Sequence, residues 1–186
     1  MVFILQMVPL TVSKQEVVRY FLRLEAGRKK YSDLASDLLS WVNLPDRELL
    51  IQARKFADQR DDTTPLLVYT VGTSKDDRSN SISIWKREFL KCAQIYTLGI
   101  SQNMLADLEQ VKGNVLNFAL QYATKYPEFS NPPQRPDGKI PRLIVIAQSN
   151  PSSKGSYELI DGAHRLVALC RLGDETVEAY VGYPTF

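Results

Sequence analysis

The sequence predicts a mixed α/β (α+β) protein, and three observations lead to this class. Apolar runs of strand length alternate with stretches whose apolar residues recur at helical spacing. Hydrophobic residues make up 44% and charged residues 24% of the 186 residues, which is typical of a globular domain and argues against disorder. No apolar run approaches the roughly 20 residues that a membrane helix needs. We therefore expect one compact domain over 1–186, with 1–100 rich in helix.

The first 60 residues predict one strand and three helices. The apolar start MVFILQMVPL lacks the basic region and cleavage site of a signal peptide, so we interpret it as a strand. The capping box SKQE predicts a helix over 14–26 that stops at Gly27. Apolar residues at helical spacing predict two more helices, over 31–44 and 45–59, and a proline opens the second of them.

The middle of the chain shows weaker patterns. PLLVYTVG, at 65–72, predicts a buried strand, and the polar, turn-rich residues 73–81 predict an exposed loop. The stretch 82–100 is compatible with strand or helix. From 102 to 126 the apolar residues follow helical spacing again, with a break or bend at Gly113.

The last third alternates strand and helix most clearly. A loop over 127–139 is followed by predicted strands over 140–148 and 156–160. A helix over 163–172 and a strand over 176–182 complete the pattern, with a glycine after the helix as its C-cap.

The turn DGAHR joins a predicted strand to this last helix, and it holds the single histidine of the chain. The first N–H groups of such a helix point to solvent and favour an anion, and Gly162 lets a ligand oxygen approach the backbone. Arg165 offers a planar fork of donors suited to phosphate, and His164 adds a donor or a proton. Asp161 caps the helix or helps to hold a divalent cation.

Each of these residues also has a purely structural interpretation. Asp161 alone is more often an N-cap than a ligand, and Gly162 is compatible with a simple turn. Arg165 in a first turn usually lies in solvent, and a lone histidine such as His164 is more often not catalytic. Their combination at one helix N-terminus favours the binding hypothesis, and the apolar helix body confines the chemistry to the first turn.

Charge and cysteine content narrow the function classes. A net charge of +2 and a pI near 8.5 permit nucleic-acid binding without indicating it. Cys92 and Cys170 form no CxxC motif, which argues against a disulfide framework or zinc site and favours a reducing cytoplasm. Two basic clusters are candidate DNA-backbone contacts, or else solvated faces: Arg28, Lys29 and Lys30, and Lys86 and Arg87.

The segment PRLIVIAQSNPSSKGSYELIDGAHRLVALCRLGDETVEAYV resembles the ParB/sulfiredoxin superfamily. The signature of that family is a strand, a G-x-H-R type turn that opens a helix, and a further strand. The resemblance implies a nucleotide-binding module over 101–186 with an N-terminal helical extension or insertion. It implies that Gly162, Ala163, His164 and Arg165 hold the phosphates of ATP, ADP or CTP. Asp161 matches the acidic residue of the kinase-like members.

The sequence departs from two branches of that family. Sulfiredoxins have a reactive cysteine where this chain has Ala163, so we do not expect repair of oxidised peroxiredoxin. ParB partition proteins add a DNA-binding helix-turn-helix after the nucleotide module. The chain ends at Phe186, so we do not expect centromere binding of that kind.

The layout is similar to that of the plasmid fertility-inhibition factors of this fold. This implies hydrolysis of ATP with Mg²⁺ or Mn²⁺ held by Asp161, with His164, Arg165 and Asp161 catalytic. It also implies cleavage of DNA and blockade of DNA transfer through type IV secretion, with the coupling protein as a partner. The expected location is the cytoplasm, with membrane association only through partners. The alternatives are a small-molecule (serine-type) kinase and a non-catalytic binding protein switched by nucleotide.

Overall fold

The computed structural model describes residues 9–59, 65–98, 102–129, 141–152 and 155–185. The fold is mixed α/β, as the sequence predicts. The chain divides into two compact units. We call them the helical unit, built around Thr11–Trp85, and the sheet unit, built around Lys86–Pro184. The boundary between the two units lies at residue 85.

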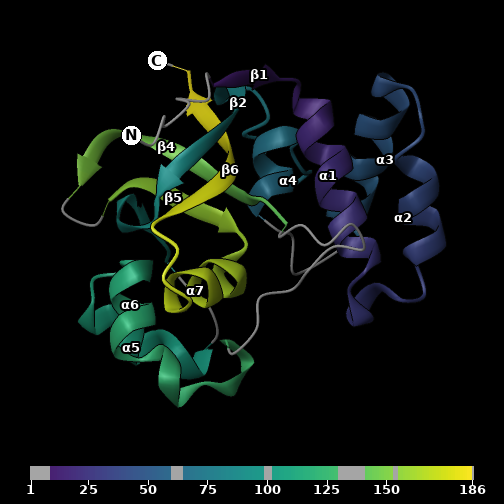
Figure 1. The fold of residues 1–186 in the computed structure, drawn as a ribbon. Helices are drawn as coiled ribbons and strands as arrows, with labels where there is room; N and C mark the ends of the chain where they lie inside the picture. The colour runs from purple at the N-terminus through teal and green to yellow at the C-terminus, as the bar shows by residue number, and fades with distance from the viewer. Residues whose placement is uncertain (1–8, 60–64, 99–101, 130–140, 153–154, 186) are drawn as a thin grey trace, which may run out of the picture. The chain divides into compact units, whose positions relative to one another are not determined.

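Four α-helices make up most of the helical unit (Figure 1). The first begins where the capping box predicts, because Ser13 Oγ accepts a hydrogen bond from the Glu16 backbone N–H at 3.1 Å, and Gly27 follows its last turn. The predicted helix over 31–44 is shorter and follows the 3₁₀ turn Lys29–Tyr31. The helices are α1 (Lys14–Ala26), α2 (Ala35–Trp41), α3 (Asp46–Asp58) and α4 (Pro65–Thr70).

Arg19 of α1 fixes the corner between α2 and α3. Its Nε donates to the carbonyl oxygen of Val42 at 3.0 Å, and its Nη2 donates to that of Leu44 at 2.8 Å. Its Nη1 lies 2.8 Å from the carboxylate of Asp46, the first residue of α3. One guanidinium therefore satisfies carbonyls that follow α2 and pairs with an acid at the start of α3.

The predicted strand over 65–72 is wrong, because these residues form helix α4. Its apolar run is continuous because the helix is buried on several sides. The buried residues are Leu66, Leu67, Val68 and Val71. Periodicity cannot separate a short buried strand from a short buried helix. Gly72, with φ +69°, ends the segment in either case.

Six strands form one mixed sheet in the order β1-β2-β6-β4-β5-β3. The central β4 runs antiparallel to β5 and parallel to β6, and the short β3 runs parallel to β5. The predicted first strand lies outside the described residues except for its end. The strands are β1 (Leu10–Val12), β2 (Ile82–Lys91), β3 (Ile95–Tyr96), β4 (Leu143–Ser152), β5 (Gly155–Asp161) and β6 (Thr176–Pro184).

The stretch 82–100 is compatible with strand or helix from its sequence, and its described part forms two strands, β2 and β3, with a 3₁₀ turn, η2 (Cys92–Gln94), between them. Residues 99 and 100 lie outside the described residues. The predicted break at Gly113 is confirmed, since it separates α5 (Leu105–Gln110) from α6 (Val115–Gln121). Backbone φ is positive at both Lys112 (+53°) and Gly113 (+76°), which no α-helix can accommodate.

Three helices of the sheet unit cover one side of its strands (Figure 1). These are α5, α6 and α7 (Ala163–Arg171), accompanied by the 3₁₀ turns η3 (Gln102–Met104), η4 (Ala123–Lys125) and η5 (Pro127–Phe129). Their apolar side chains and those of the strands form one hydrophobic core. In the part of the chain that the structure describes, no helix has the length and hydropathy needed to cross a bilayer.

Candidate functional site

The predicted turn lies where β5 ends and α7 begins. The register places Asp161, the last residue of β5, opposite Ile144 near the start of β4. Gly162 is the N-cap residue of α7 and has φ +103°, a conformation that side chains of L-residues rarely adopt. A Cβ at this position would lie 2.7 Å from Arg165 Nη2 and 2.7 Å from Leu143 Cδ2. The backbone conformation therefore favours glycine at residue 162, and a side chain there would have to displace the ends of Arg165 and Leu143.

Asp161 and Arg165 form an ion pair inside this turn. Arg165 Nη2 lies 2.7 Å from Asp161 Oδ2 and 3.1 Å from the carbonyl oxygen of Arg142. Only 9% of Asp161 and 6% of Arg165 is exposed to solvent. Arg165 Nε is also buried and has no hydrogen-bond partner among the described residues. The guanidinium therefore lies beneath the turn, directed at Asp161, and does not project into solvent as a first-turn arginine usually does.

The other two predicted residues, Ala163 and His164, differ in their exposure. Ala163 is half-buried and packs against the core of the sheet unit. His164 is exposed, and its ring meets that of Phe129 edge to face, with centroids 5.2 Å apart. Phe129 in turn packs edge to face on Phe118 of α6 at 6.1 Å. The imidazole is therefore open to solvent on one side and oriented by an aromatic ring on the other.

A second charged group lies next to the turn, and no pattern in the sequence indicates it. Glu178 Oε1 of β6 lies 2.8 Å from Arg142 Nε and 3.1 Å from Arg87 Nε. The parallel pairing of Leu143 with Ala179 brings Arg142 and Glu178 together. Because the Arg142 carbonyl also accepts from Arg165, this group is connected to the turn through one backbone oxygen. Only the strand register, which the sequence does not show, could have identified it.

The predicted DNA contacts fall in two places. Arg28, Lys29 and Lys30 belong to the helical unit, where Arg28 pairs with Glu25 at 2.8 Å and the Lys30 ammonium lies 4.5 Å from the Tyr31 ring centroid. Lys29 and Lys30 are exposed.

The other cluster belongs to the sheet unit. Lys86 lies over the Tyr183 ring at 5.0 Å, and Arg87 pairs with Glu178. Both basic side chains are half-buried, so this cluster is less available to a phosphate backbone than Lys29 and Lys30.

The surroundings of Asp161 do not fit the expected divalent cation. Its carboxylate is buried and bonded to Arg165, whose positive charge would compete with a metal ion. Across the described ranges there is no cluster of three or more histidine, cysteine, aspartate or glutamate side chains arranged to hold a metal. We therefore derive no chemical step through a protein-bound metal.

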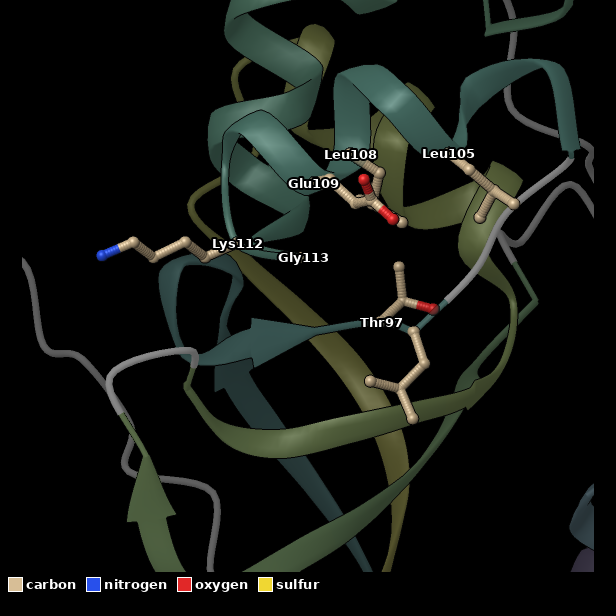
Figure 2. Close-up of a pocket in the computed structure, with 7 residues that line it drawn as sticks. Thr97, Leu105, Leu108, Glu109, Lys112 and Gly113 are labelled. Atoms are coloured by element: carbon tan, nitrogen blue, oxygen red, sulfur yellow. The ribbon is translucent and has the colours of Figure 1, made fainter.

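A separate pocket of about 350 Å³ lies between the end of β3 and α5 (Figure 2). Figure 2 shows the Glu109 carboxylate and the Leu108 side chain on the side of the pocket that faces Thr97, whereas the Lys112 side chain points away. None of the candidate site residues predicted from the sequence lines this pocket. Its lining residues are Thr97, Leu98, Leu105, Leu108, Glu109, Lys112 and Gly113.

Comparison of the chain with protein-family models, with curated proteins and with solved structures finds no match. The assignment of function therefore depends on the geometry of the turn at Asp161–Arg165 and on the sequence resemblance.

Proposed function

We propose that this chain is a nucleotide-binding phosphohydrolase of the ParB/sulfiredoxin type, which holds the phosphates of ATP at the first turn of α7. The observation that supports this most is the strand–Gly162–helix turn with a buried guanidinium beneath it. Gly162 keeps side-chain atoms away from the turn, and the helix end adds partial positive charge. Arg165 adds a full positive charge that Asp161 offsets, so the turn attracts phosphate mainly through backbone N–H groups.

In the proposed reaction, His164 acts on the attacking water. The neutral imidazole accepts a proton as the water oxygen bonds to the terminal phosphorus, and the bond from that phosphorus to the ADP oxygen breaks. His164 suits this role because it is exposed in the first turn and its ring is oriented by Phe129. In this proposal Arg165 is a positioning residue that holds the turn, and it does not contact the transferred group.

The proposal extends to cleavage of DNA and to blockade of DNA transfer through type IV secretion. This part depends on the resemblance to plasmid fertility-inhibition factors. The exposed Lys29 and Lys30 are the available contacts to a phosphate backbone. If nucleotide binds without release of phosphate, the protein is instead a nucleotide-switched binding module.

The test adds an acid to the proposed phosphate site without unfolding the helix. His164→Glu puts a negative charge in the first turn of α7, where the helix dipole favours it, so the fold should be retained. The same charge repels phosphate, and we expect ATP to bind at least about tenfold more weakly by calorimetry.

Asn117→Glu is the matched control. Asn117 is an exposed first-turn residue of α6 in the same unit, and its backbone N–H bonds to Asn114 Oδ1, so an acid is compatible with that turn. The control should bind ATP like the wild type and release phosphate at the same rate. Equal affinity in all three proteins would remove ATP from this turn. If the His164→Ala variant binds ATP normally and also hydrolyses it at the wild-type rate, the imidazole is excluded as the base.

A further inference from the structure

A close backbone contact forms one wall of the pocket between β3 and α5 (Figure 2). The Thr97 N–H donates to the Gly113 carbonyl oxygen at 2.9 Å, so the chain that leaves α5 lies directly against the end of β3. A Cβ at residue 113 would lie only 2.6 Å from the Thr97 carbonyl oxygen, and φ at Gly113 is +76°. Glycine therefore permits this approach, and main-chain contacts hold the wall of the pocket in place.

The same turn separates the two charged residues of the lining, Glu109 and Lys112. In a continuous helix, opposite charges three residues apart lie on one face and attract each other. Lys112 instead has φ +53°, outside the helical range, and its side chain points away from the pocket. The Glu109 carboxylate lies on the side that faces Thr97, and within the described ranges it has no ion-pair partner. The pocket therefore presents a negative charge.

Leucine side chains provide the apolar part of the lining. Leu98 is 66% and Leu105 36% exposed, whereas Leu108 is buried in the core of the sheet unit. A ligand that covers Leu98 and Leu105 would remove apolar surface from water, which favours binding. The volume of about 350 Å³ is near the lower end of the range of roughly 300–1,000 Å³ that is usual for ligand pockets. The shape and lining therefore suit a small molecule with a hydrocarbon body.

We propose that this pocket binds a small organic cation, namely a protonated amine that carries a short hydrocarbon chain. The ammonium group pairs with the Glu109 carboxylate, and the chain covers Leu98 and Leu105. Glu109 is exposed, so the ion pair contributes modestly and burial of the chain supplies most of the affinity. An anion such as phosphate would be repelled by the same carboxylate. The inference does not depend on nucleotide binding at the turn of α7.

The test titrates the full chain with n-pentylammonium, n-pentanol and pentanoate at about pH 7, where the amine is protonated. In ¹H–¹⁵N NMR spectra, we expect saturable shifts of the backbone amides of Thr97, Glu109 and Gly113. Pentylammonium should bind about two- to fivefold more tightly than pentanol, and pentanoate should bind more weakly than either. Between n-propylammonium and n-pentylammonium, each added methylene should tighten binding by about fourfold, because it is buried against leucine.

Two variants test the role of the carboxylate. Glu109→Gln should weaken the binding of pentylammonium by about two- to fivefold and leave that of pentanol unchanged. The matched control is Glu175→Gln, which removes the same charge from an exposed residue of the sheet unit that does not line the pocket, and it should bind both probes like the wild type.

The comparison of the three probes on the wild type needs no variant, so a Glu109 variant that fails to fold does not remove the test. The inference is overturned if the amides around the pocket show no saturable shifts, or if pentanoate binds as tightly as pentylammonium. Equal weakening by Glu109→Gln and Glu175→Gln would also overturn it, because the effect would then reflect net charge alone.

Discussion

The carboxylate of Asp161 and the guanidinium of Arg165 lie 2.7 Å apart, and the two residues, four apart in the sequence, are almost wholly buried. Removing either partner leaves a charge unpaired in the core. We expect Arg165→Ala to lower the free energy of unfolding by about 3–5 kcal/mol in urea titrations. In the double variant Asp161→Ala/Arg165→Ala, the decrease in the free energy of unfolding should be smaller than the sum of the decreases in the two single variants.

The exposed pair Arg78–Asp76, at the same 2.7 Å, is the control for that cycle. Its coupling energy should be about 0.2–1 kcal/mol, as for surface pairs in general. If the coupling energy between Asp161 and Arg165 is no larger than this, the buried pair does not hold the turn. ATP binding by Arg165→Ala is informative only if the variant remains folded.

Gly162 and Gly173 flank α7 and provide a matched pair of substitutions. Both have positive φ, +103° and +93°, so alanine is strained by about 1–3 kcal/mol at either position. Only at Gly162 would the new Cβ also meet Arg165 and Leu143, whereas at Gly173 nothing lies within 4 Å of it. Gly162→Ala should therefore unfold at a lower urea concentration than Gly173→Ala. Equal midpoints would show that Arg165 and Leu143 move aside without cost.

Asp107 and Lys125 form a pH-sensitive contact between α5 and η4, with Lys125 Nζ 3.0 Å from Asp107 Oδ2. The hydrogen bond from Lys125 lowers the pKa of Asp107 below its usual value, and the hydrogen bond to Asp107 raises the pKa of Lys125. The carboxylate therefore adds stability above the unfolded pKa of about 3.9, and this is lost as the pH falls through the lower folded pKa. The ammonium adds stability below the unfolded pKa of about 10.4, and this is lost as the pH rises through the raised folded pKa.

The measurement is the difference in unfolding free energy between the wild type and Asp107→Asn across pH. The difference should be largest between those limits and shrink at both ends. Asp107 also accepts a hydrogen bond from the Tyr126 hydroxyl at 3.0 Å, so Tyr126→Phe is needed to separate that contribution. A difference that stays constant from pH 2 to 7 would mean that the ionised carboxylate does not stabilise the fold.

DNA binding tests the remaining part of the proposed function. Replacing Lys29 and Lys30 with glutamine should weaken binding equally for all sequences and reduce the salt slope by about one per lost phosphate contact. ATP hydrolysis should not change. Plasmid nicking with magnesium or manganese should be compared for this variant, His164→Glu and the wild type. Nicking that survives His164→Glu while ATP binding is lost would place the DNA reaction elsewhere.

The sequence predicts best those features that local chemistry decides. Ser13 and Glu16 define the start of α1, and Gly113 breaks the helix between α5 and α6, because caps and positive φ leave a signature in a few neighbouring residues. The strand–turn–helix around Gly162 follows for the same reason. The secondary structure of the segment at 65–72 could not be predicted correctly. Its residues are buried on several sides, so its apolar residues follow one another without the spacing that distinguishes a helix from a strand.

Features that depend on pairing between distant segments were not visible in the sequence. Glu178 meets Arg87 and Arg142 only through the order and register of β2, β6 and β4. Likewise, a usual first-turn arginine points to solvent, but Arg165 is drawn inward because Asp161 and the Arg142 carbonyl both lie beneath the turn. The predicted residues are therefore neighbours in space as well as in sequence, with Arg165 in a different orientation from the expected one.

The position of β6 in the sheet has a consequence for synthesis on the ribosome. β6 is the last described strand in the sequence, yet it lies between β2 and β4. Until it emerges, the strands already made cannot join into one sheet, and the edges of β2 and β4 that β6 will cover lack their partner. Such edges are templates for pairing with other chains, so we expect the nascent chain to be prone to misassociation until β6 leaves the exit tunnel.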